Sequence, residues 1–408
     1  MAGKTIVVLG GGVGGLVASS ELRKKLGREH RIVLVDKETH HVFAPSFTWV
    51  MLGWRDPSRI SRELGLLKKK GIEYVNAEAL EIDPANRLVK TGAGDFAYDY
   101  LIVALGAELN PQAVPGLLEA AHTPYSLEGA VVLRDALNDF AGGKVAVVIA
   151  ALPFKCPAAP YETALLLEYA FRQRGIRDKV DLRVFTPETL PMPVAGPEVG
   201  TAIKLFLDER GIGFHPQHKP ASVDPGKKEI AFENGQKAGF DLLVAVPPHR
   251  NPEVVRKSGL ANEAGWIPVD RRTLKTSVEN VFALGDVTSV LLPGRYRPDT
   301  PLTLPKAGVF AHFQATAVAG NILSEIKGGT GGKEFSGRGY CFLETGYGMA
   351  GYGSGNFYGE PAAGGYVRPS RPALALCEGP VREVVVTSLV LRGRGDAQDA
   401  RPIPAEAR

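Results

Sequence analysis

Three side chains in this sequence have the chemistry to move electrons and protons. Cys156 lies in the stretch FKCPAAPYE, Glu162 follows it by six residues, and Cys341 lies far downstream in GYCFLETG. A cysteine thiolate attacks or forms disulfides and persulfides, and a carboxyl group can carry the protons that such reactions release. Spacing alone does not pair the cysteines. Each one singly is more often a small buried side chain, and Glu162 also suits the first turn of a helix.

The position of Cys156 favours the chemical interpretation. Residues 144–150, KVAVVIA, form a predicted buried strand, and a helix is predicted over residues 162–174. In a nucleotide-binding unit a glycine-rich loop joins such a strand and helix, because only glycine lets backbone amides reach a pyrophosphate. Here AALPFKC stands in that place. We therefore predict a second nucleotide-type unit without a nicotinamide site, and an electron donor other than NADH.

A complete dinucleotide signature opens the chain. An apolar strand over residues 4–9 leads into GGGVGG, a helix to about residue 26, and a second strand that ends at Asp36. In the GxGxxG register, Gly10 permits the tight turn, Gly12 lets the backbone approach a pyrophosphate, and Gly15 packs helix on strand. Asp36 can accept a hydrogen bond from a ribose hydroxyl. The unit predicts a dinucleotide site.

Three motifs together carry a family resemblance. TIVVLGGGVGG, YDYLIVALGA and VENVFALGDV resemble the flavoprotein disulfide reductase superfamily, and KCPAAPYE with GYCFLETG resembles the sulfide:quinone oxidoreductase family. The flavin subunit of flavocytochrome c sulfide dehydrogenases is similar too. The resemblance implies an α/β fold with two Rossmann-like dinucleotide-binding domains plus a smaller C-terminal domain, and FAD as cofactor.

The resemblance also implies the remaining cofactor residues. Gly106 ends the second motif, Asp286 in the third would accept from the flavin's ribityl chain, and Lys306 and Gly308 begin a helix predicted over residues 309–326. The positive end of that helix would face the flavin. The stretch HHVFAPS lacks the cysteine that tethers flavin in the flavocytochrome relatives, so FAD is expected to be non-covalent.

In the family, Cys156 and Cys341 would be the redox pair and Glu162 the proton carrier. Sulfide would be oxidised to polysulfide or sulfur, and the electrons would reduce a membrane quinone. Because a thiolate is needed, we expect nearby positive charge to lower a cysteine pKa. Tyr125, in HTPYSLEGA, stands where many members carry a third cysteine. Cys377 has no family counterpart.

The motifs divide the chain into three predicted domains. Residues 1–110 and 265–330 would form the FAD-binding domain, residues 111–264 the second Rossmann-like domain without the NAD loop, and residues 331–408 a C-terminal domain on the quinone and membrane side. The tail from residue 372 is atypical, since it is polar and lacks the family's interfacial helix. Whether the tail after Arg371 is native or results from a shifted reading frame stays open.

The composition limits the partners. The 408 residues carry a net charge of +4 without basic runs, which argues against nucleic acid. No apolar stretch is long enough to span a membrane, no secretory signal is readable in MAGKTIVVLG, and no metal-ligand spacing stands out. Sulfide, a membrane quinone and a peripheral contact with the cell membrane are the expected partners, with a homo-oligomer left open.

Three alternatives remain at this point. A flavocytochrome c type sulfide dehydrogenase subunit would pass electrons to a cytochrome. A type II NADH dehydrogenase would need the second glycine loop that is missing here. A non-enzymatic flavin scaffold would bury its sulfurs without using them. His40, His41, His122, His215 and His218 are explained equally well by structural roles.

Overall fold

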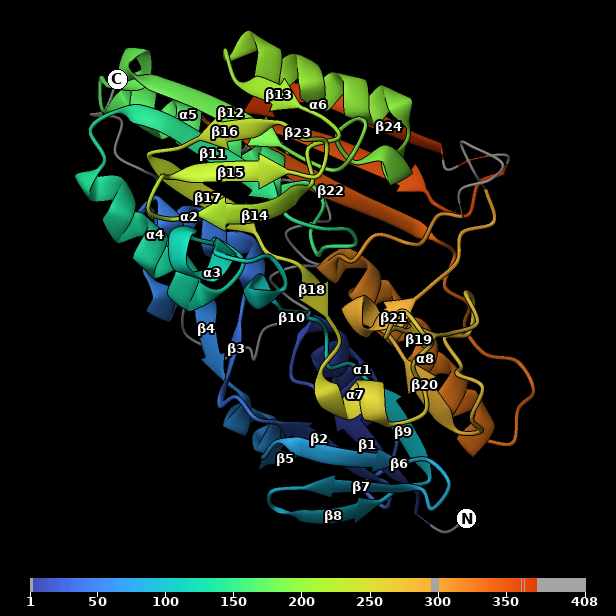
Figure 1. The fold of residues 1–408 in the computed structure, drawn as a ribbon. Helices are drawn as coiled ribbons and strands as arrows, with labels where there is room; N and C mark the ends of the chain where they lie inside the picture. The colour runs from blue at the N-terminus through green and yellow to red at the C-terminus, as the bar shows by residue number, and fades with distance from the viewer. Residues whose placement is uncertain (1–2, 295–300, 361, 363, 373–408) are drawn as a thin grey trace.

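The computed structural model describes residues 3–294, 301–360, 362 and 364–372. Its first sheet has the strand order β20-β9-β1-β2-β5, and every pair is parallel. The strands are β1 (Thr5–Leu9), β2 (Arg31–Asp36), β5 (Glu73–Asn76), β9 (Tyr100–Val103) and β20 (Val281–Ala283). Strand β20 therefore returns to the sheet from far downstream, at the bottom of Figure 1.

Both faces of this sheet are covered, which is why its strands read as continuous apolar runs. Ile6 and Val8 face the helices α1 (Val13–Lys25) and α8 (Gly308–Ile326), which pack against each other. Val7 and Leu9 belong to the core on the opposite face. That face is covered by β6 (Ala79–Asp83), β7 (Leu88–Thr91), β8 (Gly94–Ala97) and α7 (Glu253–Lys257).

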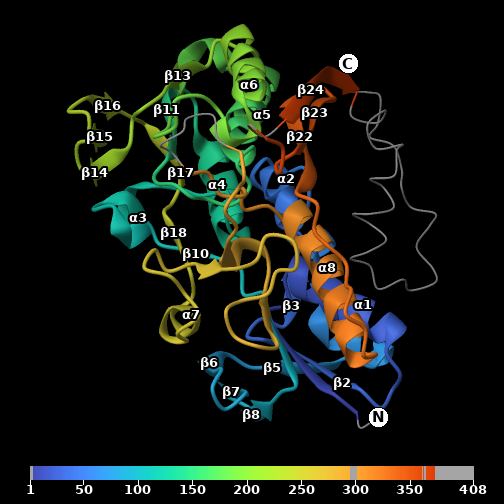
Figure 2. The ribbon, with the colours of Figure 1, turned by 90° about the vertical axis from the view of Figure 1, so that its right-hand side faces the viewer.

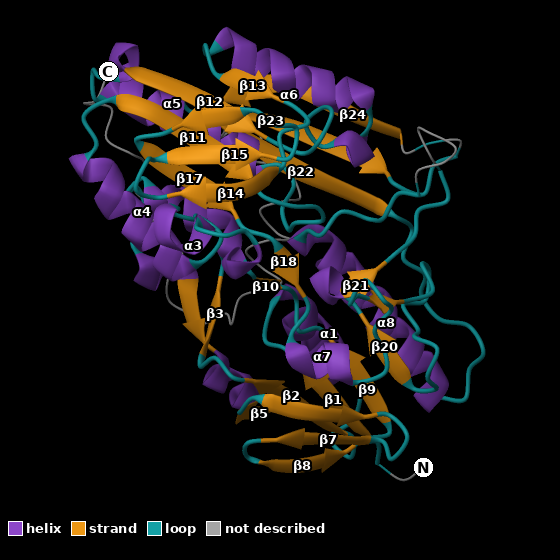
Figure 3. Ribbon diagram, viewed as in Figure 1, coloured by secondary structure: helices purple, strands orange, loops and turns teal. Residues whose placement is uncertain are grey.

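A second parallel sheet has the order β13-β12-β11-β17 and lies at the top of Figure 3. Its strands are β11 (Gly143–Ile149), β12 (Val180–Phe185), β13 (Gly213–His215) and β17 (Leu242–Val246). One face packs on α4 (Leu127–Asp139), α5 (Ala159–Gln173) and α6 (Pro197–Glu209), and the other on β14 (Pro220–Asp224), β15 (Glu229–Phe232) and β16 (Lys237–Gly239). The strand and helix on either side of the Cys156 loop are thus β11 and α5.

The C-terminal part of the described chain is an antiparallel sheet. It consists of β22 (Arg338–Gly346), β23 (Met349–Asn356) and β24 (Gly364–Pro372). Strand β22 packs on α5 and α8, and β24 packs on α6. In Figure 2 this sheet lies above the upper end of α8. The contact of β22 with α5 brings the Cys341 strand onto the helix that carries Glu162.

Short elements connect these layers. They are α2 (Phe47–Met51), α3 (Leu117–Ala120), β3 (His40–Val42), β4 (Ser61–Glu63), β10 (Glu108–Leu109), β18 (His249–Arg250), β19 (Ile267–Pro268) and β21 (Thr288–Ser289). Among the helices of the described residues, none has the length and hydropathy that crossing a membrane requires.

A buried carboxylate fastens the turn between β22 and β23. Glu168 of α5 is fully buried and forms an ion pair with Arg172 (2.8 Å), and the guanidinium of Arg210 lies 3.5 Å from it. Tyr347, at the turn, donates its hydroxyl to Glu168 Oε2 (3.2 Å), while Arg210 lies 4.1 Å from the centre of the Tyr347 ring. These contacts fix β22, and with it Cys341, against α5.

The architecture is α/β with parallel sheets, as the motifs predict. Strand β20 joins the first sheet, and strands between residues 143 and 246 supply the second. Strands β22 and β23 pair as an antiparallel hairpin. The atypical tail lies outside the described residues from residue 373 on.

Candidate active site

The Cys156 loop is fixed by its backbone. Cys156 has φ = +53°, in the left-handed region that residues other than glycine rarely adopt. Its N–H donates to the carbonyl oxygen of Lys306 (2.6 Å). Its own carbonyl oxygen accepts from the N–H of Ala159 (2.9 Å) and from the hydroxyl of Tyr125 (3.2 Å). The loop that replaces a glycine-rich turn is therefore attached to the segment that leads into α8.

Cys156, Cys341 and Glu162 form one cluster. The two cysteines are free thiols. Burial is the main cause that raises the pKa of both, well above the usual range for Cys156 and to about 12 for Cys341. The negative charge of Cys341 further raises the pKa of Cys156, and the charge of Glu162 acts on both thiols. The three predicted catalytic side chains therefore lie within electrostatic range of one another.

One expectation about this cluster is wrong. We expected positive charge to lower a cysteine pKa, but burial dominates and raises it. Removal from water disfavours the charged form of a thiol. A thiolate can therefore form in this site only when a nearby group accepts its proton. The positive group nearest in sequence is Lys155, whose ammonium interacts electrostatically with Cys156.

Glu162 is the proton acceptor that the cluster offers. Its Oε1 accepts from the hydroxyl of Thr48 in α2 (3.1 Å), and its Oε2 accepts from the backbone N–H of Glu344 in β22 (3.0 Å). Burial, followed by the charge of Glu344, raises the pKa of Glu162 to about 8, while these two hydrogen bonds act in the opposite direction. A carboxyl group with this pKa can both take and release a proton near neutral pH.

The glycine loop after β1 has the shape that a dinucleotide requires. Gly10 has φ = +105°, and a Cβ there would lie 2.4 Å from the carbonyl oxygen of Ala104. A Cβ on Gly15 would lie 1.9 Å from the carbonyl oxygen of Gly10, so this glycine permits α1 to pack on β1. Around Gly12 the space is open, and Gly12 caps α1 without a side-chain hydrogen bond. A pyrophosphate fits at this helix terminus.

Asp36 supports the same loop. Its Oδ2 accepts from the N–H of Gly11, and its Oδ1 accepts from the N–H of Glu38 (2.7 Å). A carboxylate has about four acceptor positions, so Asp36 can still accept from a ribose hydroxyl. His41 lies beside the loop, with Nδ1 3.0 Å from the carbonyl oxygen of Gly11. The sequence did not reveal this contact.

The segment around Asp286 offers a second group of side-chain and backbone atoms that could contact a flavin. Asp286 Oδ1 is buried and has no hydrogen-bond partner among the described residues. A buried carboxylate oxygen needs such a partner, and a ribityl hydroxyl would supply it. Gly106 has φ = +68° with open space around it, and Gly308 is the first residue of α8, whose N-cap makes no side-chain hydrogen bond. FAD thus fits the donors and acceptors present.

Lys306 has a more structural position than the sequence suggested. Its ammonium donates to the carbonyl oxygens of Asp286 (2.7 Å) and Thr288 (2.9 Å), and it lies 3.5 Å from the centre of the Trp266 ring. Burial lowers its pKa to about 8, although the charge of Asp286 acts in the opposite direction. Lys306 therefore holds the Asp286 segment and, through its carbonyl oxygen, Cys156.

Several residues of the site escaped the sequence analysis. The ammonium of Lys155 has no hydrogen-bond partner among the described residues, and it interacts with the charges of Asp286 and Cys156. His249 packs edge-on against Tyr125 at 5.8 Å, and burial lowers its pKa to about 3. For these residues, the one indication in the sequence was that Lys155 directly precedes Cys156. Nothing in the sequence indicated Thr48 or Glu344.

The end of the second sheet is filled by side chains. Glu188, after β12, accepts from the hydroxyls of Tyr161 and Thr186, the latter at 3.0 Å, and Phe154 of the Cys156 loop is buried. Burial raises the pKa of Glu188 to about 7. These side chains occupy the region where a second glycine loop would bind a dinucleotide.

The other histidines of this half pack within the structure. His215 stacks on Phe185 at 4.6 Å, and His218 Nε2 lies 3.0 Å from Gln236 Oε1. The backbone of His122 bridges to Val244. In the part of the chain that the structure describes, no group of three histidine, cysteine or acidic residues is arranged to hold a metal ion.

Comparisons with known proteins find similar oxidoreductases. Residues 4–309 match the family model described as pyridine nucleotide-disulphide oxidoreductase. The chain is 32% identical over 335 residues to the sulfide-quinone reductase of Aquifex aeolicus, which covers 79% of this chain and 77% of that protein. It is 29% identical over 298 residues to the mitochondrial sulfide:quinone oxidoreductase of Mus musculus, which covers 70% of this chain and 66% of that protein.

A solved structure is also similar. The crystal structure of the sulfide:quinone oxidoreductase from Aquifex aeolicus superposes with a TM-score of 0.83 at 27% identity and covers 93% of this chain and 91% of that chain. The similarity therefore includes the C-terminal sheet as well as the two parallel sheets.

Proposed function

This chain belongs to the sulfide:quinone oxidoreductase family within the pyridine nucleotide-disulphide oxidoreductases, and on that premise we propose that it oxidises sulfide at Cys156 and Cys341 and reduces a quinone. The observation that supports this most is the hydrogen bond between Cys156 and Lys306. It brings a nucleophilic sulfur to the segment that carries Asp286 and the start of α8, beside the expected flavin.

The sulfur chemistry needs both cysteines. In the oxidised enzyme the two sulfurs are joined, and hydrosulfide attacks one of them. A new sulfur–sulfur bond forms on that cysteine, the bond between the cysteines breaks, and the other cysteine leaves as a thiolate. The proton of hydrosulfide passes to the Glu162 carboxylate. A second hydrosulfide attacks the outer sulfur of this persulfide and leaves with it as a hydrodisulfide, the shortest polysulfide, while the bond from that sulfur to the cysteine breaks. Both cysteines are then reduced, and their sulfur–sulfur bond would re-form when the electron pair passes to the bound flavin.

The family implies a flavin cofactor, and we propose that it is FAD held without a covalent bond. Gly10, Gly12 and Gly15 would receive the pyrophosphate, Asp36 the ribose and Asp286 the ribityl chain. Gly106 and the α8 terminus at Gly308 would lie along the ring, with Lys306 supporting them. The flavin, when bound, takes the electron pair from the sulfur site and delivers it to the quinone. Acid precipitation should release the flavin into the supernatant.

The C-terminal sheet is the expected quinone side. Residues 331–408 would form this domain, and attachment to the membrane would be peripheral. The filled end of the second sheet, with Phe154 and Glu188, supports sulfide rather than NADH as the electron donor.

The test is anaerobic addition of sulfide to the purified flavoprotein while the absorption of the oxidised flavin is followed. We expect loss of that band with sulfide and no loss with NADH, which would instead indicate a type II NADH dehydrogenase. A soluble quinone should then restore the band faster than cytochrome c does. Faster reoxidation by cytochrome c would favour the flavocytochrome alternative. No reaction with sulfide, together with unreactive thiols, would favour a scaffold.

A further inference from the structure

A second, partly buried acidic residue lies beside Glu162. Glu344 is three residues beyond Cys341 on β22, and its backbone N–H is the donor to Glu162 Oε2 described above. Its own side chain does something different: Oε2 accepts from the indole N–H of Trp49 in α2. Side chains of α2 therefore donate to both carboxyl groups, Thr48 to Glu162 and Trp49 to Glu344, where α2, α5 and β22 meet.

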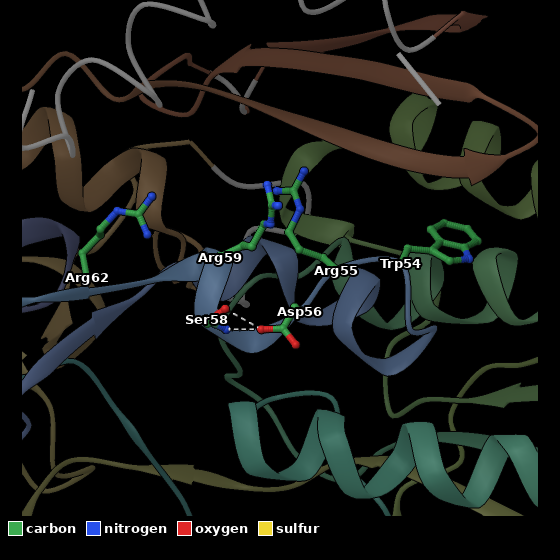
Figure 4. A pocket seen from close by; sticks show the side chains of 6 residues that line it. All are labelled: Trp54, Arg55, Asp56, Ser58, Arg59 and Arg62. Atoms are coloured by element: carbon green, nitrogen blue, oxygen red, sulfur yellow. Dashed lines mark hydrogen bonds between the residues drawn. The ribbon is translucent and has the colours of Figure 1, made fainter. Parts of the chain in front are cut away.

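Two neighbours of Glu344 favour its charged form against the effect of burial. Burial raises the pKa of Glu344, while the hydrogen bond from Trp49 and the charge of Arg55 act in the opposite direction. The guanidinium of Arg55 lies 4.1 Å from the centre of the Trp49 ring. Its side chain also lines a cavity of about 630 Å³, together with Trp54, Asp56, Ser58, Arg59 and Arg62 (Figure 4). Glu344 thus contacts Glu162 through its backbone and Trp49 through its side chain. Trp49 in turn lies against Arg55, which lines this polar cavity.

A purely structural role does not require this charge. The amide oxygen of a glutamine would accept from Trp49 equally well, and removal of a carboxylate from water costs free energy. A charged group retained beside a second carboxyl is the arrangement by which proteins separate the proton affinities of two acids. A function in proton handling explains the acid where packing alone does not.

We propose that Glu344 is a positioning residue of the sulfur site, whose negative charge helps Glu162 to take up and hold the proton that hydrosulfide releases. This rests on the proposed function and deepens it. Glu162 exchanges the proton with the sulfurs, and Glu344 acts only through Glu162. The hydrogen bond from Trp49 and the charge of Arg55 favour the charged form of Glu344 that this role requires.

The other charges that face the pair are few. Cys341 of β22, Cys156 of the loop before α5 and Tyr125 of the loop before α4 lie within electrostatic range of Glu162. Arg55 is the cation that faces Glu344. Removal of the Glu344 charge should therefore change the titration of Glu162, because among the described residues no second acidic residue nearby would compensate for the lost charge.

The test measures the titration of Glu162 itself. Infrared spectroscopy reports the protonated carboxyl group as a function of pH, and Glu162→Gln identifies its band. In Glu344→Gln the midpoint should fall by about one pH unit, because a neighbouring negative charge is lost. In Thr48→Val it should rise, because a hydrogen bond to the charged form of Glu162 is lost. Opposite shifts are not expected from general loosening of the site.

An unchanged midpoint in Glu344→Gln would overturn the inference, and so would a rise. If that variant does not fold, Trp49→Phe gives a second measurement, since loss of the indole donor should also lower the midpoint. The pH profile of sulfide-driven flavin reduction should move in the same directions. Because the infrared measurement needs no sulfide, failure of the proposed function and failure of this inference are distinguishable.

Discussion

The N–H of Cys156 donates to the carbonyl oxygen of Lys306 at 2.6 Å. These residues lie in different parts of the chain. Cys156 is in the loop between β11 and α5, and Lys306 is just before α8. Lys306 in turn holds the backbone of Asp286 through its ammonium. One short chain of contacts therefore joins the reactive sulfur to the segment that would bind the flavin's ribityl chain.

Loss of either sulfur should stop the reaction with sulfide. We expect Cys156→Ser and Cys341→Ser to slow sulfide-driven flavin reduction by at least about 1,000-fold, because each removes one of the two exchanging sulfurs. Anaerobic stopped-flow absorption measures this rate. Cys377→Ser is the control and should react as the wild type does. Full activity in either of the first two variants contradicts their assignment as the redox pair.

Glu162 should make stability depend on pH. Its pKa is raised from 4.5 to about 8 by burial, so the folded state keeps a proton that the unfolded state loses. The stability that this group contributes is complete below pH 4.5 and is lost as the pH rises towards 8. Glu162→Gln should therefore gain about 3 kcal/mol over the wild type between pH 5 and pH 8. Urea unfolding at both pH values measures the difference.

The control for that experiment is Glu263→Gln, at an exposed position. Its stability relative to the wild type should be the same at both pH values. If the stability of Glu162→Gln relative to the wild type is also the same at both pH values, the Glu162 carboxyl group keeps an ordinary pKa in the folded protein.

Tyr125 should hold the Cys156 loop. Tyr125→Phe removes the hydroxyl that donates to the Cys156 carbonyl oxygen (3.2 Å) but keeps the ring beside His249. We expect a loss of about 1 kcal/mol in the free energy of unfolding. Sulfide-driven flavin reduction should slow about tenfold, because small displacements of a reacting atom are costly.

Tyr98→Phe is the matched control, since the buried Tyr98 hydroxyl has no hydrogen-bond partner among the described residues. Its removal should leave both stability and rate nearly unchanged. Equal effects of the two substitutions would show that the Tyr125 hydroxyl has no special role at Cys156.

Asp286 should contribute to flavin affinity. Asp286→Ala removes the buried oxygen that lacks a partner among the described residues. We expect flavin to bind about 10- to 100-fold more weakly, which corresponds to one hydrogen bond to a charged group. Asp286→Asn keeps an acceptor oxygen and should bind with intermediate affinity. Fluorescence titration of the flavin-free protein with FAD measures both, and wild-type affinity in Asp286→Ala would exclude the contact.

The sequence determined the scaffold and the identities of the reactive groups. The GxGxxG register of Gly10, Gly12 and Gly15 is local, because a tight turn and a close helix require glycine at fixed positions. The absence of glycine around Cys156 is equally local. Both features could be interpreted without coordinates, and they predicted the parallel sheets and the family.

Only the tertiary structure decided how the groups act on one another. Burial raises the pKa of Cys156 and Cys341, whereas the sequence suggested that nearby charge would lower it. Desolvation depends on what α2, α5 and β22 enclose together, and no local pattern contains that information. For the same reason Glu344 became visible only when β22 was placed against Glu162. The sequence specifies which residue types are present, but the proton affinities of their side chains depend on packing between distant segments.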